Sequence, residues 1–103
     1  LRRHIRKKQL NHLQRLVRSA NKPCIVAGDF NVLLGPEELT DFLTAAGLEH
    51  ANLENRPTYP SWKPNRVLDF VCYTPNIKLR AFMLPNVFLS DHLPLVCDFE
   101  LPV

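Results

Sequence analysis

The sequence lacks the features that define several other classes of protein. No apolar run approaches the roughly 20 residues that a membrane-spanning helix needs, and no signal-peptide pattern, internal repeat or low-complexity segment is present. The cysteines are odd in number, widely spaced and without a C-x-x-C pair; they are Cys24, Cys72 and Cys97. Buried reduced thiols fit this pattern better than disulfides or a zinc site, which favours a reducing compartment such as the cytoplasm.

The composition is that of one small globular domain. The chain has 103 residues, of which 46% are apolar and 22% are charged, and this length limits it to a single modest core. It begins at Leu1 rather than at a methionine, so we expect it to be a piece of a longer protein. Most of the net charge of +3 comes from residues 1–18. Such a cluster is typical of the solvated face of a helix, and contact with phosphates is the alternative.

Apolar periodicity predicts two helices and a strand in the first half of the chain. Residues 3–20 have apolar side chains at helical spacing and basic residues on the other face, and residues 21–23 end in a proline that stops the helix. Residues 24–28 predict a short strand buried on both faces. A second helix is predicted over 36–47, with proline in its first turn and glycine as its left-handed cap.

The second half predicts an ordered loop followed by three strands. Residues 51–65 contain three prolines and two aromatic residues, which indicates an ordered surface loop. Strands are predicted at 67–73, 77–83 and 95–101, and the short link at 74–76 predicts that the first two form an antiparallel pair. The order of elements predicts the α/β class, with a mixed sheet and flanking helices.

Polar side chains interrupt the apolar runs at three places. These are Asp29 with Asn31, then Asp69, then Ser90-Asp91-His92. Each has a purely structural interpretation, as turn formers, as the polar face of a half-exposed strand, or as a loop histidine. Burying one of these polar side chains beside a core strand would cost free energy unless it had hydrogen-bond or ionic partners. Together they offer hard oxygen ligands suited to Mg²⁺ or Mn²⁺ and one imidazole that titrates near neutral pH, which is a set suited to phosphate-ester hydrolysis.

Four segments carry a resemblance to a known family. GDFN at 28–31, RVLDF at 66–70 and SDHLPLVCDFEL at 90–101 follow one another in the order found in the endonuclease/exonuclease/phosphatase (DNase I-like) superfamily, and PTYPSW at 57–62 is similar to a loop of many bacterial members. The chain resembles the C-terminal half of such a domain. The resemblance implies that residues 1–103 are part of a four-layer α/β/β/α sandwich whose N-terminal half is missing.

The resemblance also implies a role for each polar residue. Asp29 would lie beside the metal and orient or activate the attacking water, while Asn31 would bind a phosphate oxygen. Asp91 would be a metal ligand, direct or through water. His92 would act as general base or, protonated, would stabilise the pentacovalent state, and Asp69 would hold its ring. The implied reaction is a Mg²⁺- or Mn²⁺-dependent hydrolysis of a phosphodiester by in-line attack of water.

The substrate stays open at this point. Nucleic acid, a phospholipid or sphingolipid headgroup, and a phosphoinositide all suit the implied chemistry. Tyr59 and Trp62 are candidates for stacking on a base or for contact with a lipid interface, and anchoring of their loop on the core is the alternative. Arg66, at the start of its motif, is a third candidate substrate contact.

The family's N-terminal motifs have no counterpart in this chain. The resemblance therefore implies that the chain supplies about half of the site and one of two sheets, and that the isolated chain is inactive and marginally stable, with an apolar face exposed. Two other hypotheses remain. One is a non-catalytic binding relative, although all five implied site residues are present. The other is a basic nucleic-acid-binding module that depends on residues 2–18.

Overall fold

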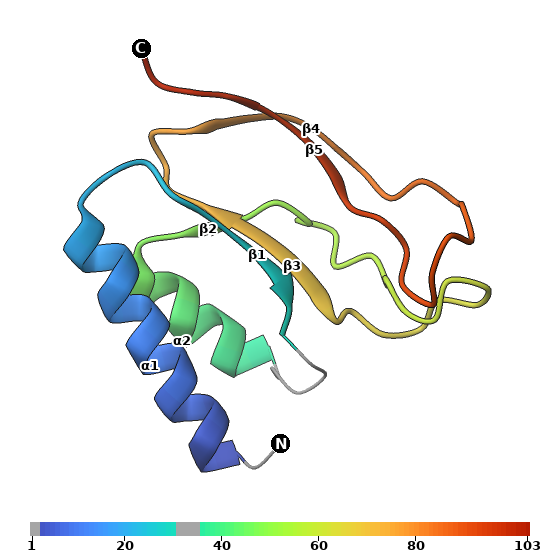
Figure 1. Cartoon of the computed structure of the whole chain (residues 1–103), viewed down its shortest axis with the longest axis horizontal. Coiled ribbons are helices and arrows are strands. Elements are labelled where there is room, and N and C mark those ends of the chain that lie inside the picture. The colour runs from blue at the N-terminus through green and yellow to red at the C-terminus, as the bar shows by residue number, and fades with distance from the viewer. Residues whose placement is uncertain (1–2, 31–35) are drawn as a thin grey trace.

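Two helices and two small sheets form three layers. The computed structural model describes the backbone of residues 3–30 and 36–103, and side chains from residue 7 to 30 and from 38 onward. The elements are α1 (Arg3–Ala20), β1 (Ile25–Asp29), α2 (Pro36–Ala46), β2 (Glu49–His50), β3 (Asp69–Tyr73), β4 (Lys78–Met83) and β5 (Val96–Glu100). The helices cover one face of the β1–β3–β2 sheet, and the β4–β5 pair lies over the other (Figure 1).

The two helices begin and end near the predicted residues. Asn21 has a left-handed backbone conformation just after α1, and Gly47 has one just after α2, at φ +70°. The Leu48 N–H then donates to the Leu43 carbonyl over 2.9 Å, which satisfies a carbonyl at the end of the helix. Arg18 of α1 donates from Nε to the Ala45 carbonyl over 2.7 Å. A cation at the negative end of α2 therefore joins the two helices.

The predicted hairpin between residues 67–73 and 77–83 is wrong. Strand β3 lies in the middle of its sheet, antiparallel to β1 on one side and β2 on the other. Both edges of β3 are therefore occupied, so the turn after Tyr73 leads to a second sheet, where β4 pairs with β5. This turn is bonded to the start of β1, because Thr74 Oγ1 accepts from the Cys24 N–H over 3.0 Å.

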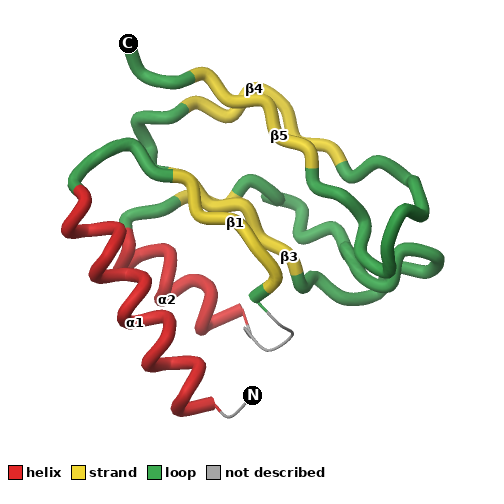
Figure 2. Tube along the Cα trace, viewed as in Figure 1, coloured by secondary structure: helices red, strands yellow, loops and turns green. Residues whose placement is uncertain are grey.

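Three related expectations need correction. The chain contributes strands to two sheets rather than to one (Figure 2). All strand pairs within the described residues are antiparallel, whereas a mixed sheet was expected. Strand β1 is largely exposed rather than buried on both faces, because Val26 packs against the helix-side core while most other β1 side chains are exposed. The α/β class with flanking helices is confirmed.

The alternation of side chains along β3 separates two cores. Phe70 and Cys72 face the helices and join a cluster that includes Val17, Phe42, Ala46 and Leu48. Val71 and Tyr73 face the other way, toward apolar residues of β4 and β5 such as Phe82 and Phe99. Because successive side chains of a strand point to opposite faces, Asp69 lies on the same face as Val71 and Tyr73. No helix in the described part of the chain is long and apolar enough to cross a membrane.

His50 is expected to make the fold sensitive to acid. Its side chain is buried against Phe70, and neither ring nitrogen has a hydrogen-bond partner within residues 3–30 and 36–103. Burial lowers the pKa of His50 below 6.5, and the nearby Val71 backbone opposes this only in part. The unfolded chain then binds the proton more readily than the folded one, so the free energy of unfolding falls as the pH drops below 6.5 toward the lowered folded pKa.

Urea unfolding of the complete domain at pH values of about 7.5 and about 5.5 measures this effect across the range in which histidine titrates. The wild type is expected to lose stability at the lower pH, and the His50→Leu variant is expected to lose less. Equal losses in the two proteins would show that another group causes the acid sensitivity.

Candidate active site

Strand register brings Asp29 and Asp69 together. In the antiparallel pairing of β1 with β3, Asp29 is directly opposite Asp69, so the two side chains lie on the same face of the sheet. The pairing continues one residue further, where the Phe30 N–H donates to the Leu68 carbonyl over 3.0 Å. The Phe30 ring turns to the other face and packs on Phe42 and Phe70. The strand therefore buries its aromatic residue and presents its carboxylate.

His92 reaches the two carboxylates from the long connection between β4 and β5. Its Nδ1 lies 2.7 Å from Asp69 Oδ2, and its Nε2 lies 3.7 Å from Asp29 Oδ2. These side chains are separated widely in sequence, yet one ligand atom of each lies within 4.8 Å of the others. A short Nδ1 bond to a carboxylate fixes the ring and its tautomer, which leaves Nε2 as the nitrogen that faces outward.

The surrounding carboxylates favour the protonated form of His92. The hydrogen bond to Asp69 raises the pKa of His92 most, burial opposes it, and the charges of Asp69, Asp29 and Asp91 raise it further. The imidazole can therefore accept a proton at Nε2 or, once protonated, donate from it. This is the behaviour needed of a group that acts on a phosphate ester near neutral pH.

Of the predicted substrate contacts, Tyr59 lies against the site. Its ring centroid is 4.9 Å from that of His92, with 50° between the ring planes. Trp62 is 67% exposed, and its neighbour Ser61 is bonded to the turn that carries His92. Arg66 contributes its backbone, which forms a bridge with Tyr59. Tyr59 therefore supports the imidazole, while Trp62 lies open to solvent.

Two predicted site residues are not part of the cluster of Asp29, Asp69 and His92: Asp91 lies outside it, and Asn31 lies outside the described residues. The Asp91 carboxylate accepts from Ser90 Oγ over 3.1 Å and is exposed. Among residues 3–30 and 36–103, the cluster of candidate metal ligands comprises Asp29, Asp69 and His92 and does not include Asp91. Asn31 lies outside the described residues, so its predicted contact with phosphate stays a prediction.

The sequence interpretation missed two buried hydroxyls in the loop before β3. Thr58 is 0% exposed and Ser61 is 2% exposed, and their hydroxyls bond to the segments that carry Asp69 and His92. Prolines and aromatic residues dominate the segment at 57–62, and its small polar residues resemble those of any surface loop. The signal that was available is the capacity of Ser and Thr in loops to bond to nearby backbone groups.

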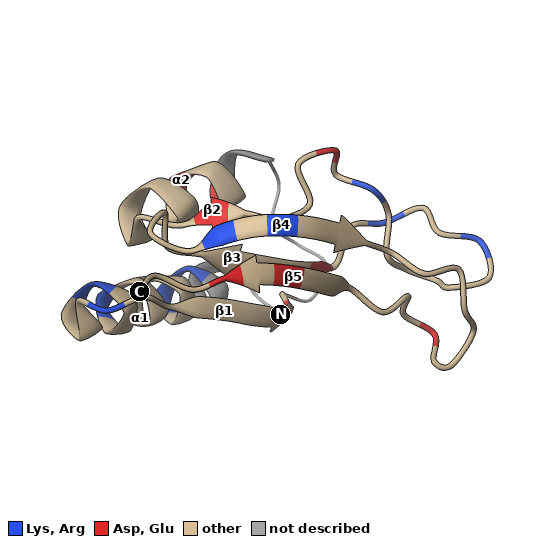
Figure 3. Ribbon diagram, turned by 90° about the horizontal axis from the view of Figure 1, so that it is seen from above, with Lys and Arg blue, Asp and Glu red and all other residues tan. Residues whose placement is uncertain are grey.

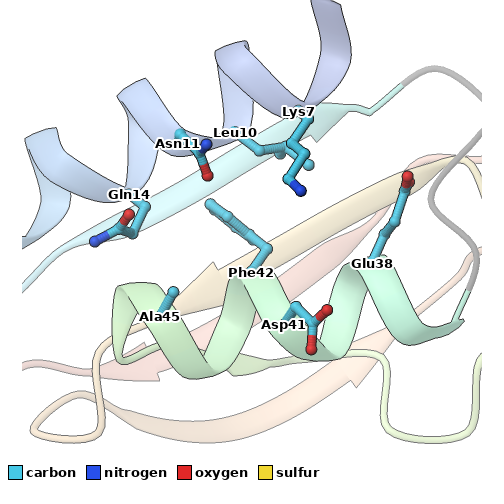
Figure 4. Close-up of a pocket in the computed structure, with 8 residues that line it drawn as sticks. All are labelled: Lys7, Leu10, Asn11, Gln14, Glu38, Asp41, Phe42 and Ala45. Carbon is cyan, nitrogen blue, oxygen red and sulfur yellow. The ribbon is translucent and has the colours of Figure 1, made fainter. Parts of the chain in front are cut away.

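A hollow between α1 and α2 lies away from the cluster of Asp29, Asp69 and His92. It is lined by Lys7, Asn11 and Gln14 of α1 and by Glu38, Asp41 and Phe42 of α2, among others (Figure 4). Lysine and arginine positions follow α1 (Figure 3), but here Lys7 shares the hollow with two carboxylates. A surface that binds nucleic acid through phosphates is dominated by positive charge, so this hollow does not favour the basic-module hypothesis.

The residues at the site fit a partly hydrated divalent cation. Mg²⁺ in phosphoryl-transfer sites is commonly held by one or two carboxylates, with water and substrate oxygens completing its shell. The Asp29 side chain is 45% exposed, whereas that of Asp69 is 16% exposed and is bonded to His92. Asp29 is thus the carboxylate of the cluster best placed for a metal that keeps several waters.

Comparison with known proteins identifies the family of this chain. The model of the endonuclease/exonuclease/phosphatase family matches residues 1–92, and the chain belongs to that family. The family is named for endonucleases, exonucleases and phosphatases, which are enzymes that hydrolyse phosphate esters. Both the predicted family and the predicted DNase I-like fold are confirmed.

Two particular proteins are similar to this chain. Human Nocturnin is 29% identical over 118 residues, which cover 88% of this chain and 27% of Nocturnin. A mannosyl-6-phosphatase of Bacteroides thetaiotaomicron has a similar fold, with a TM-score of 0.68 and 18% identity, over 92% of this chain and 44% of that protein. The chain thus spans less than half the length of either relative.

Proposed function

We propose that this chain supplies one part of the active site of a divalent-metal-dependent phosphodiesterase, with the remainder of the domain supplying the rest. The observation that best supports the proposal is the arrangement of His92 between two carboxylates, 2.7 Å from Asp69 and 3.7 Å from Asp29. A non-catalytic relative would have no need to keep an imidazole oriented in this way. The family contains phosphoesterases, which supports hydrolysis as the reaction class.

In this proposal each of the three side chains has a separate task. Asp69 accepts a hydrogen bond from the Nδ1–H of His92 and holds the ring, and Nε2 then faces the side on which Asp29 lies. Asp29 orients the attacking water by accepting a hydrogen bond from it. As the new P–O bond forms and the bond to the leaving oxygen breaks, one proton of this water passes to Nε2 of a neutral His92, or to Asp29 if His92 is already protonated and donates to a phosphoryl oxygen.

The metal would be Mg²⁺ or Mn²⁺, held by Asp29 and Asp91 together with ligands from the rest of the domain. When bound, it would neutralise phosphoryl oxygens and lower the pKa of a bound water. Asn31 would donate to a phosphoryl oxygen. These assignments follow the resemblance to the family, and the exposed positions of Asp29 and Asp91 support them.

The proposed substrate is a phosphodiester in nucleic acid or in a phospholipid headgroup. Trp62 supports a substrate with a flat or apolar part, since it is largely exposed and follows a residue bonded to the His92 turn. Base stacking on an aromatic residue and contact with a lipid interface both use such a side chain. Arg66 would add a positive charge beside the polyanion.

A substrate panel tests the proposal directly. The complete domain is assayed with single-stranded nucleic acid, sphingomyelin, a phosphoinositide and a hexose 6-phosphate, each with Mg²⁺ and with EDTA. Cleavage of a phosphodiester bond in one of the first three, abolished by EDTA, is the expected result. Release of inorganic phosphate alone, from the sugar phosphate or from the ring of the phosphoinositide, would replace phosphodiester by phosphomonoester, and no hydrolysis of any of the four would contradict the proposed function.

The isolated 103-residue chain is expected to hydrolyse none of these substrates. Its fold leaves β1 at the edge of one sheet, and apolar side chains such as Ile25, Met83 and Val96 are exposed, as expected of surfaces that the rest of a domain covers. The measurement compares turnover by the isolated chain and by the complete domain at equal concentration. Equal turnover would show that the chain holds the whole site.

A further inference from the structure

We propose that Thr58 and Ser61 are positioning residues that set the geometry of the His92–Asp69 pair. The proposal rests on the proposed function, because it assigns these hydroxyls to the same site. Asp69 begins β3, whereas His92 lies in the connection between β4 and β5. The loop that carries Thr58 and Ser61 lies between these two segments and is hydrogen-bonded to both.

Thr58 is hydrogen-bonded both to the start of β3 and to the segment that carries His92. Its hydroxyl oxygen accepts from the Leu68 N–H over 3.1 Å and from the Asp69 N–H over 3.3 Å. Its carbonyl accepts from the Leu93 N–H over 2.8 Å. One fully buried residue therefore contacts the backbone of Asp69 and that of the residue after His92.

Ser61 holds the turn that precedes His92. Its hydroxyl donates to the Ser90 carbonyl over 2.6 Å, and its N–H donates to the Asp91 carbonyl over 2.7 Å. Ser90 Oγ in turn accepts from the His92 N–H over 3.2 Å. The backbone on the N-terminal side of the imidazole is thus fixed by Ser61, and the backbone on its C-terminal side is fixed by Thr58.

These bonds have a catalytic consequence although neither hydroxyl reaches the reacting atoms. The His92–Asp69 bond is short and directional, so a small displacement of either backbone lengthens it and turns Nε2 away from Asp29. Small errors in the placement of catalytic groups reduce rates steeply. The buried hydroxyls of Thr58 and Ser61 position the His92–Asp69 pair, whereas the exposed Trp62 in the same loop does not.

The test compares Thr58→Val with Thr58→Ser in the complete domain. Valine keeps the size of the side chain and removes the acceptor, whereas serine keeps the acceptor. We expect Thr58→Val to lower kcat by about tenfold or more with KM within about twofold, and Thr58→Ser to restore kcat to within about threefold of the wild type. Unchanged kcat in Thr58→Val, or failure of Thr58→Ser to restore it, would overturn the proposal.

A matched control separates positioning from general loss of a buried bond. Thr74 Oγ1 also accepts from a backbone N–H, that of Cys24, at the other end of the β1–β3 pair. Thr74→Val is expected to leave kcat unchanged. A loss equal to that of Thr58→Val would show that any lost hydroxyl bond slows the enzyme, and would overturn the specific role.

A spectroscopic measurement keeps the proposal testable without turnover. We expect the Nδ1 proton of His92, bonded to Asp69, to give a downfield proton resonance that reports the length of the bond. We expect this resonance to move in Thr58→Val and to return in Thr58→Ser, whether or not the substrate panel yields activity. An unmoved resonance would overturn the proposal even if the proposed function stands.

Ser61→Ala replaces Thr58→Val if the valine variant does not fold. It removes the bond to the Ser90 carbonyl and leaves the backbone bond to Asp91 in place. We expect the same displacement of the His92 Nδ1 resonance and a fall in kcat of about threefold or more with little change in KM. A wild-type resonance together with wild-type kcat would contradict the role of Ser61 and of the loop.

Discussion

Replacement of His92 by alanine in the complete domain is expected to lower kcat by on the order of 10²-fold or more, with a smaller change in KM. The variant removes the imidazole that lies between Asp69 and Asp29, and with it the group that accepts or donates a proton at the phosphoryl group. Loss of an interaction made in the transition state lowers kcat and kcat/KM together. Steady-state kinetics on the best substrate of the panel measures both constants.

The control for this variant is His12→Ala. His12 is exposed on α1, so its loss changes the histidine content without touching the site, and wild-type kinetics are expected. A His92→Ala enzyme with near-wild-type kcat would remove His92 from the mechanism. A loss of activity in both variants would point to a general effect of substitution.

Replacement of Asp69 by asparagine is expected to lower kcat by on the order of 10²-fold and to move the pH profile. The hydrogen bond to Asp69, together with its charge, raises the pKa of His92. Asparagine removes the charge, so the pKa of His92 falls toward its ordinary value. The limb of the profile that His92 controls therefore moves to lower pH, whether the neutral or the protonated imidazole is the active form.

Which limb of the pH profile moves distinguishes the two roles of His92. A general base requires the neutral ring, so the acid limb of the profile would move to lower pH. A proton donor requires the protonated ring, so the alkaline limb would move instead. Measurement of kcat/KM against pH in wild type, Asp69→Asn and the exposed-site control Asp41→Asn tests this, and a profile that Asp69→Asn leaves in place would contradict the role of Asp69.

The residues of the candidate site could be singled out from the sequence because they break local patterns. Asp29 ends one apolar run and Asp69 interrupts another, and His92 follows a carboxylate between two apolar runs. Each deviation is visible within a few residues. The resemblance to the family predicts that these residues share one site, and in the structure one ligand atom each of Asp29, Asp69 and His92 lies within 4.8 Å of the others.

The division of the strands between two sheets could not be predicted in the same way. The turn at 74–76 is short enough for a hairpin, and nothing local reveals that β3 has both edges occupied. Pairing across a sheet depends on segments distant in sequence, as does the register that places Asp29 opposite Asp69. The helices depend on periodicity within one segment, and their ends were accordingly predicted closely.

Thr58 and Ser61 escaped prediction for a related reason. A hydroxyl in a proline-rich loop has the same local pattern whether it is exposed or buried. What distinguishes Thr58 is its burial and its bonds to two segments that fold beside it. Such contacts exist only in the folded chain, so the residues that position a site are harder to find than those that give it charge.

The two alternative hypotheses are less well supported by the same features. A binding relative without activity would not require the short bond between His92 and Asp69, which orders an imidazole without adding a binding surface. A basic nucleic-acid module would rely on α1, where the hollow that includes Lys7 also contains Glu38 and Asp41. Neither hypothesis accounts for the convergence of three titratable groups from three segments of the chain.

In the proposed function, Asp29, Asp69 and His92 form part of a metal-dependent hydrolytic site. The most direct test of this proposal is the hydrolysis rate of the complete domain as Mg²⁺ is titrated, for wild type, Asp29→Asn and the control Asp41→Asn. We expect a rate that rises with Mg²⁺, is abolished by EDTA, and falls by on the order of 10²-fold in Asp29→Asn while Asp41→Asn behaves as wild type. A rate indifferent to EDTA, or a near-wild-type rate in Asp29→Asn, would contradict it.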